Sequence, residues 1–133
     1  MKHIKGFSEL VLIVEDVKKS FEFYRDVIGL SVKSRSDDWI WFYVGETNNN
    51  QRLALHKGKL LFEEKSPLPE GKRFGQIHFA FEVERNNLEQ ALEIVNCSGT
   101  EVYGPQIFEW MKAVSYYFYD PDGNLIEYWS PNN

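Results

Sequence analysis

The chain has 133 residues, 43% of them hydrophobic, which is the size of one globular domain and small for two independent ones. Its 15 basic and 20 acidic residues give a net charge of −5, which leaves no positive field to hold nucleic acid. Cys97 is the single cysteine, which excludes an internal disulfide, and no apolar segment has the length of a signal region or a bilayer span, so we expect a cytoplasmic protein without a membrane partner.

The first half of the chain predicts one strand, one helix and three further strands. Residues 7–14 are mostly apolar and β-branched, which is typical of a buried strand. Residues 17–27 carry apolar side chains every three to four positions, which predicts an amphipathic helix that Gly29 is well placed to end. Three shorter strands are predicted at residues 30–34, 39–44 and 52–57, with polar turns between them.

The same order of elements then repeats. Residues 63–74 hold two prolines and show no periodicity, so they are predicted to be a surface linker. After it come a strand at 75–83, a helix at 87–96, and strands at 101–103, 112–119 and 125–130. A duplication accounts for this order, because positions 9 and 78 and the two helix starts near 16 and 85 are each 69 residues apart.

This repetition predicts the fold class. One helix covers one face of a small sheet, and a second copy of the unit can cover the other face. We therefore expect an α+β protein in which residues 1–133 form a single domain of two βαβββ modules, whose mixed sheets enclose a cleft. Module one is expected at about residues 6–60 and module two at about residues 75–131.

Three stretches resemble the vicinal oxygen chelate superfamily, which contains glyoxalases, bleomycin-resistance proteins and extradiol dioxygenases. They are ELVLIVEDVKKSFEFYRDVIGL at 9–30, QIHFAFEV at 76–83 and YFYDPDGNLIEYWSP at 117–131, and together they span most of the chain. The resemblance implies paired βαβββ modules, a homodimer, a small-molecule ligand in the cleft, and, in the enzymes of the family, a divalent metal held by His and Glu side chains.

The resemblance also assigns candidate metal ligands. Its ligand positions fall on Glu9, His78 and Glu127, and Glu9 departs from the histidine that many metal-binding relatives have there. A fourth position falls near 54–56, where strand alternation allows His56 to face the cleft. These ligand types suit zinc, nickel, manganese or iron, and Glu9 or Glu127 would be the catalytic base.

The residues by themselves leave other readings open. A charged Glu9 inside an apolar strand must meet a cation, a hydrogen-bond partner or water. His78 alternates with Ile77 and Phe79 and so faces away from both, but a lone strand histidine is more often structural. Lys57 and Lys59 beside His56 indicate a solvated strand end. The Asp-Pro-Asp-Gly sequence at 120–123 has the chemistry of a turn, and too few residues for a calcium loop.

The high aromatic content, 16% of the chain, indicates either a ligand cavity or a protein interface. The aromatic candidates for the wall of the cleft are Trp39, Trp41, Phe108, Trp110 and Tyr117.

Three hypotheses of function follow. The first is a metal-dependent lyase, isomerase or dioxygenase-like enzyme that binds two neighbouring oxygens of a substrate. The second is a metal-free protein that sequesters a flat small molecule, as the bleomycin-resistance relatives do. The third is an interaction module whose cleft is filled by its own side chains.

Overall fold

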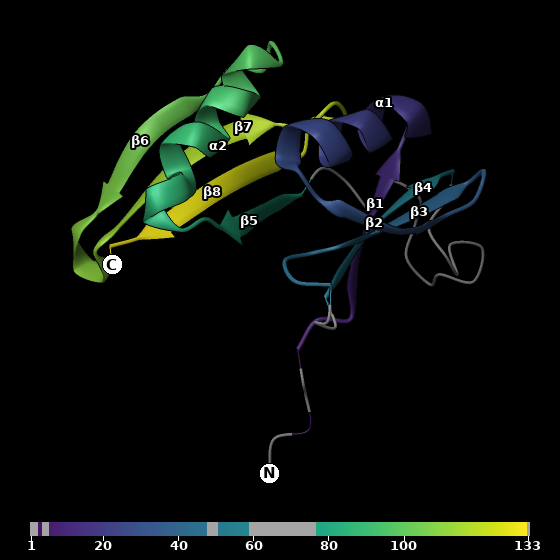
Figure 1. The fold of residues 1–133 in the computed structure, drawn as a ribbon, viewed down its shortest axis with the longest axis horizontal. Coiled ribbons are helices and arrows are strands. Elements are labelled where there is room, and N and C mark those ends of the chain that lie inside the picture. Colours follow the sequence, from purple (N-terminus) through teal and green to yellow (C-terminus); the bar gives the residue numbers. More distant parts are fainter. Residues whose placement is uncertain (1–2, 4–5, 48–50, 59–76, 133) are drawn as a thin grey trace, which may run out of the picture. The chain divides into compact units, whose positions relative to one another are not determined.

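The computed structural model describes residue 3 and residues 6–47, 51–58 and 77–132. The chain divides into two compact units, unit 1 from Met1 to Arg73 and unit 2 from Phe74 to Asn133. Figure 1 traces both units in sequence colours. The predicted linker at 63–74 lies outside the described residues.

Unit 1 contains one sheet and one helical segment. Its elements are β1 (Glu9–Val14), α1 (Val17–Glu22), η1 (Phe23–Ile28), β2 (Ser31–Arg35), β3 (Trp39–Tyr43) and β4 (Arg52–Lys57). The strand order is β1-β4-β3-β2, with β1 parallel to β4 and the other pairs antiparallel. This is the βαβββ order that the sequence predicts.

The helical segment of unit 1 starts and ends where the sequence signals place it, but its second half is wider than an α-helix. Asp16 caps the start, where its side chain accepts a hydrogen bond from the Lys19 amide. From Phe23 the segment becomes the π-helix η1, which Gly29 ends in the left-handed conformation at φ 89°. Apolar spacing predicts one helix here and does not distinguish these two geometries.

Alternation along the strands gives the sheet of unit 1 one buried and one open face. On the buried face, Phe21 and Tyr24 of the helical segment pack on Phe42, with ring centroids 6.0 and 6.3 Å apart. The other buried strand residues on this face are Leu12, Val14, Ile40, Leu53 and Leu55, and the small Ala54 is buried on the opposite face. Glu9, Trp39, Trp41 and His56 therefore share the open face.

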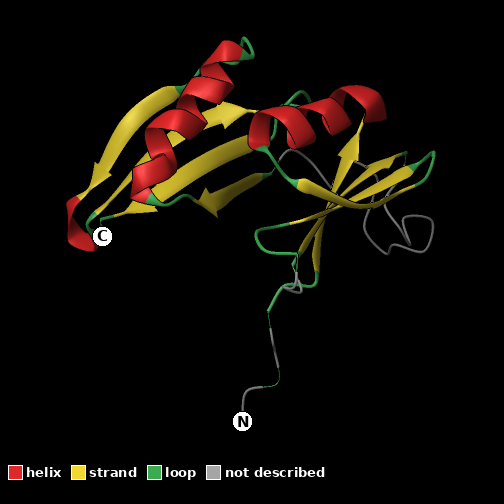
Figure 2. Ribbon diagram, viewed as in Figure 1, coloured by secondary structure: helices red, strands yellow, loops and turns green. Residues whose placement is uncertain are grey.

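Unit 2 repeats this arrangement. Its elements are β5 (His78–Glu82), α2 (Arg85–Cys97), β6 (Tyr103–Phe108), the 3₁₀ turn η3 (Glu109–Met111), β7 (Ala113–Tyr119) and β8 (Leu125–Pro131). The strand order is β5-β8-β7-β6, with β5 parallel to β8 (Figure 2). Helix α2 buries Leu88 and Val95, and the strands bury Phe118, Ile126 and Tyr128.

One strand of unit 2 differs from its prediction. The sequence predicts a strand at 101–103, whereas β6 begins at Tyr103 and continues to Phe108 through Gly104 and Pro105. β6 is an edge strand with an irregularity between Tyr103 and Gln106, where a proline removes no interior hydrogen bond. The predicted α+β class with two βαβββ modules is confirmed. No helix among the described residues has the length and apolarity needed to span a bilayer.

Candidate metal site

His78 and Glu127 lie side by side on the open face of the unit 2 sheet. In the parallel β5–β8 pair, His78 is opposite Leu125, and Glu127 is two residues further along the same face. His78 Nε2 and Glu127 Oε1 are 3.1 Å apart, and the two side chains are 49% and 12% exposed. The structure therefore brings together two of the predicted ligands.

The two ring nitrogens of His78 both face acceptors. Nδ1 lies 3.2 Å from the carbonyl oxygen of Leu125, and Nε2 lies 3.1 Å from a carboxylate oxygen of Glu127. A neutral imidazole has one N–H, so only one of these two contacts can be an ordinary hydrogen bond. A cation between Nε2 and Glu127 would leave Nδ1 as the donor to the Leu125 carbonyl.

Glu127 is held in place from its other oxygen. The hydroxyl of Ser115, a fully buried residue on β7, donates to Glu127 Oε2 at 2.5 Å. This bond leaves Oε1 facing His78. Neighbouring Tyr117, directly opposite Glu127 in the β7–β8 pair, has its phenol pKa raised, first by burial and then by the negative charge of Glu127. Tyr117 therefore stays a neutral hydroxyl beside the carboxylate.

The predicted turn at 120–124 anchors the strand that carries His78. The Asp120 carboxylate accepts hydrogen bonds from the Asp122 and Asn124 amides and from the Asn124 side chain. Asn124 Oδ1 in turn accepts a hydrogen bond from the Ile77 amide at 3.1 Å, next to His78 in the chain. The turn thus fixes the start of β5 against the β7–β8 hairpin.

In unit 1 the strand register assigns the position that matches Glu127. In unit 2, Glu127 is opposite Ala80 in the β5–β8 pair, and the corresponding β1–β4 pair places Ala54 opposite Val11. Glu9 starts β1 as His78 starts β5. Unit 1 therefore supplies a carboxylate at the matching first-strand position and an alanine at the matching last-strand position.

His56 lies apart from Glu9, although both are on the open face. Glu9 is opposite Arg52, four residues before His56, which is about 13 Å along an extended strand. His56 instead stacks on Trp39 with ring centroids 4.0 Å apart, and its Nδ1 lies 3.1 Å from the Asp38 carbonyl oxygen. Glu9 itself is exposed.

The five aromatic candidates are spread over both units. Trp39 and Trp41 are stacked 5.2 Å apart on the open face of unit 1, and Tyr117 lies on the open face of unit 2, 6.2 Å from His78. Phe108 ends β6 and lines a pocket near η3. Trp110 lies in η3 with 83% of its surface exposed.

The donor atoms of His78 and Glu127 fit a divalent metal ion. Two neighbouring ligand atoms about 2.1 Å from a metal lie roughly 3.0 to 3.4 Å apart in octahedral or tetrahedral sites, and the observed separation is 3.1 Å. The backbone bond on His78 and the Ser115 bond on Glu127 are the supporting contacts that metal ligands usually have. Among the described residues, no three His, Cys, Asp or Glu side chains form a group that could hold a metal. A metal site here therefore needs a ligand beyond this pair.

Ser115 was not among the residues that the sequence singled out. A signal for it exists, because the turn at 120–124 joins two strands whose pairing can be counted outward from the turn. That count places residues 117 and 127 opposite each other, and Ser115 on the same face two residues away.

Comparison with known proteins gives a consistent result. The family model described as the glyoxalase/bleomycin resistance protein/dioxygenase superfamily matches residues 6–128. Metallothiol transferase FosB of Staphylococcus saprophyticus is 26% identical over 125 residues, which cover 93% of this chain and 76% of that protein.

Solved structures with the same fold include an integron cassette protein from Vibrio cholerae, with 28% identity, a TM-score of 0.73 and 99% coverage of both chains. The fosfomycin resistance protein FosX of Listeria monocytogenes, solved with Mn(II) and sulfate, has a TM-score of 0.73 at 21% identity and covers 98% of this chain and 93% of its own.

Proposed function

Since the chain belongs to the glyoxalase/bleomycin resistance protein/dioxygenase superfamily, we propose that it is a divalent-metal-dependent enzyme, a transferase or lyase acting on a small molecule with adjacent oxygens. The observation that carries the proposal is the pair of donor atoms on His78 and Glu127, 3.1 Å apart. The names of the relatives agree, since FosB is a metallothiol transferase and FosX was solved with Mn(II).

Glu9 is the third ligand in this proposal. It occupies in unit 1 the position that His78 occupies in unit 2, and it is an exposed carboxylate on an open sheet face. Glu9 would complete a set of three ligands with His78 and Glu127. The homodimer that the family resemblance implies is part of the same proposal.

Two carboxylates and one imidazole favour a borderline or hard cation. Replacing the histidine of many relatives by Glu9 moves the set toward oxygen, which favours Mn(II) or Fe(II) over softer ions. Zinc and nickel remain compatible with the same ligand types. His56 has no part in this set, because it is about four strand residues away from Glu9.

The chain's own groups have distinct roles in the proposed reaction. A bound metal would supply Lewis acidity toward the two substrate oxygens. Ser115 keeps Oε2 of Glu127 occupied, so that Oε1 is the carboxylate oxygen directed toward His78. Glu9 is exposed, so in this proposal it is the carboxylate that takes a proton from the substrate whenever it is not bound to the metal through both oxygens. Tyr117, held neutral by burial and by Glu127, can donate a hydrogen bond to a substrate oxygen.

One observation favours the second function, metal-free binding of a flat molecule. Trp41, Trp39 and His56 form a run of nearly parallel rings on the open face of unit 1, with interplanar angles of 9° and 21°. Such rings stack well against planar ligands. In that case His78 would donate a hydrogen bond to Glu127, and binding would survive removal of metal.

Elemental analysis of protein purified without chelator, and after reconstitution with Mn(II), tests the proposal. We expect about one divalent ion per chain, at least tenfold weaker binding in Glu127→Ala and His78→Ala, and weaker binding in Glu9→Ala. His56→Ala is the matched control, since it removes an imidazole from an open face outside the proposed set. Metal content near zero after reconstitution, or equal loss in His56→Ala, would contradict the proposal.

A further inference from the structure

Unit 2 contains a pocket on the face of its sheet opposite to His78 and Glu127. Its volume is about 690 Å³, within the range of small-molecule sites. Val114 and Tyr116 form its floor, and their side chains point away from Ser115 and Tyr117, because neighbours in a strand face opposite sides. The other lining residues come from α2, β6, η3, the junction of η3 with β7 at Lys112 and Ala113, and Asn132 after β8.

The pocket exists because the two units differ in how their sheets are covered. In unit 1 the helical segment covers β3 fully, and Ile40 and Phe42 have no exposed surface. In unit 2 the corresponding strand is β7, where Val114 and Tyr116 remain half-exposed, and Ile107 on the neighbouring edge strand is 68% exposed. The duplicated fold thus leaves an apolar hollow in unit 2, whereas in unit 1 the equivalent position is covered by that unit's own helical segment.

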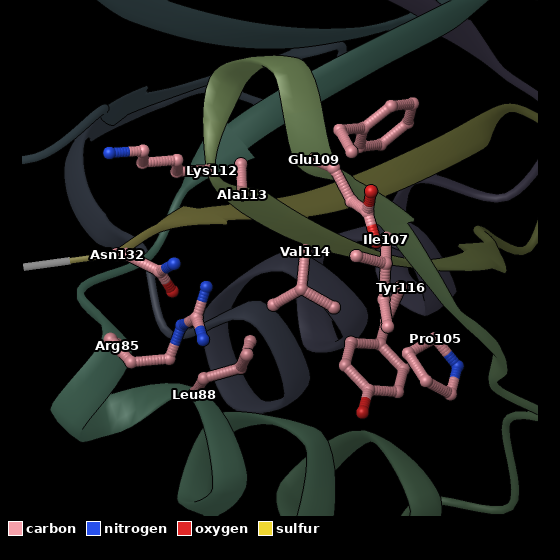
Figure 3. A pocket seen from close by; sticks show the side chains of 11 residues that line it. Arg85, Leu88, Pro105, Ile107, Glu109, Lys112, Ala113, Val114, Tyr116 and Asn132 are labelled. Atoms are coloured by element: carbon pink, nitrogen blue, oxygen red, sulfur yellow. The ribbon is translucent and has the colours of Figure 1, made fainter.

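The positively charged side chains of the pocket lie on one side of it, and the carboxylate of Glu109 lies on the other. Figure 3 shows Arg85, Lys112 and Asn132 on one side, Leu88 and Val114 in the middle, and Glu109 with Ile107 on the other side. No carboxylate among the described residues forms an ion pair with Arg85 or Lys112. One side of the pocket therefore carries two cations without an anionic partner from the described part of the chain.

The backbone holds the Arg85 guanidinium in position and takes an unusual conformation at Lys112. Arg85 Nη2 donates to the carbonyl oxygen of Ser130 at 2.8 Å, which orients the guanidinium and leaves further N–H donors available. Lys112 has φ 49°, and among the described residues it alone combines a side chain with positive φ. Glycine or asparagine is the usual choice after a helical turn in this conformation. A lysine in this conformation raises the free energy of the folded backbone, and a functional role of its side chain would explain why it is there.

We propose that this pocket binds a small molecule that has an anionic head group and an apolar, ring-sized body. The head group, a phosphate or a carboxylate, contacts Arg85, Lys112 and the Asn132 amide, and the body packs on Leu88, Val114 and Tyr116. The site is separate from the metal chemistry proposed above, since it lies on the other face of the sheet and uses none of the same side chains.

Two-dimensional amide NMR of the ¹⁵N-labelled full chain tests this proposal with defined probes. Phenyl phosphate and 3-phenylpropanoate supply the two head groups, and phenol and 3-phenylpropan-1-ol are their uncharged counterparts. We expect saturable shifts at Arg85, Val114 and Asn132 with the anions, and at least tenfold weaker binding of the alcohols. The anion with the lower dissociation constant identifies which head group, phosphate or carboxylate, the pocket prefers.

Two variants and one control complete the test. Lys112→Gly keeps the left-handed backbone while removing the cation, and should weaken anion binding about tenfold. Val114→Phe fills the hollow and should abolish binding. Lys33→Gln removes an exposed cation of unit 1 and should change nothing. The proposal would be overturned if the shifts centred on His78 and Tyr117, or if no probe gave a saturable shift. It would also be overturned if Lys112→Gly bound the anions as tightly as the unmodified chain does.

Discussion

Ser115 Oγ lies 2.5 Å from Glu127 Oε2, across the β7–β8 hairpin and on the same face of the unit 2 sheet. We expect Ser115→Ala to leave Glu127 free to rotate, and so to weaken divalent metal binding about 10- to 100-fold, the usual effect of losing a contact that orients a ligand. Calorimetric titration with Mn(II) measures this. Ser34→Ala, an exposed serine on β2, is the control, and unchanged affinity in Ser115→Ala would show that the hydrogen bond does not orient a ligand.

The pKa of Tyr117 reports the charge of Glu127. Burial and then the Glu127 carboxylate raise this pKa, so Glu127→Gln should lower it toward its ordinary value of 10.0 while the effect of burial remains. Phenolate should therefore form at lower pH in the variant. The pKa is measured by NMR with ¹³Cζ-labelled tyrosine, and Glu82→Gln on the same sheet should leave it unchanged. A pKa that does not fall in Glu127→Gln would mean that this carboxylate is not charged next to Tyr117.

Tyr128 makes stability depend on alkaline pH. Burial raises its pKa to about 12, from 10.0 for an unperturbed phenol. The unfolded chain therefore loses this proton first, so the free energy of unfolding is unaffected below pH 10 and falls between pH 10 and pH 12, by about 3 kcal/mol in total. Urea unfolding at several pH values measures the slope of the unfolding free energy against pH. Tyr128→Phe should reduce the slope, whereas Tyr119→Phe, at a half-exposed position, should not.

Asn124 ties the start of β5 to the β7–β8 turn. Asn124→Ala removes the acceptor for the Ile77 amide and a donor to Asp120, so we expect a loss of about 2 kcal/mol of unfolding free energy. Urea unfolding measures it, with Asp37→Ala in an exposed turn of unit 1 as the control. We also expect broadened imidazole signals from His78 in Asn124→Ala. Equal stability of the two variants would mean that the turn does not hold β5.

The strand and helix order could be predicted from the sequence because each unit alternates apolar and polar residues with a clear period. The same alternation predicts that His78 faces away from Ile77 and Phe79, and the register places it with Glu127. The π-helix at 23–28 could not be predicted in this way, since apolar spacing is similar for a helix that widens over one turn. The extent of β6 was missed because Gly104 and Pro105 are typical of turns, although an edge strand accepts them.

The candidate site could be predicted only in part, and most of what was predicted came from the family resemblance. Choosing between Ala54 and His56 requires the register of β1 against β4, which are distant in sequence and joined by no short turn that would fix it. The Leu125 carbonyl that holds His78 is a backbone atom, and no residue type marks its role. Charge and composition do not indicate a pocket such as the one beside Arg85, because it results from an incomplete cover over β7.

The bond between Ile77 and Asn124 joins residues 47 positions apart, while Ser115 and Glu127 are only 12 apart. Contacts within a hairpin close a short loop and form early, whereas a parallel strand pair must first close a long one. We therefore expect β7 and β8 to pair first during folding, with Glu127 already held by Ser115, and β5 to bring His78 last. An ion that bridges His78 and Glu127 would then stabilise the final step of folding, and its main kinetic effect would be to slow unfolding of unit 2.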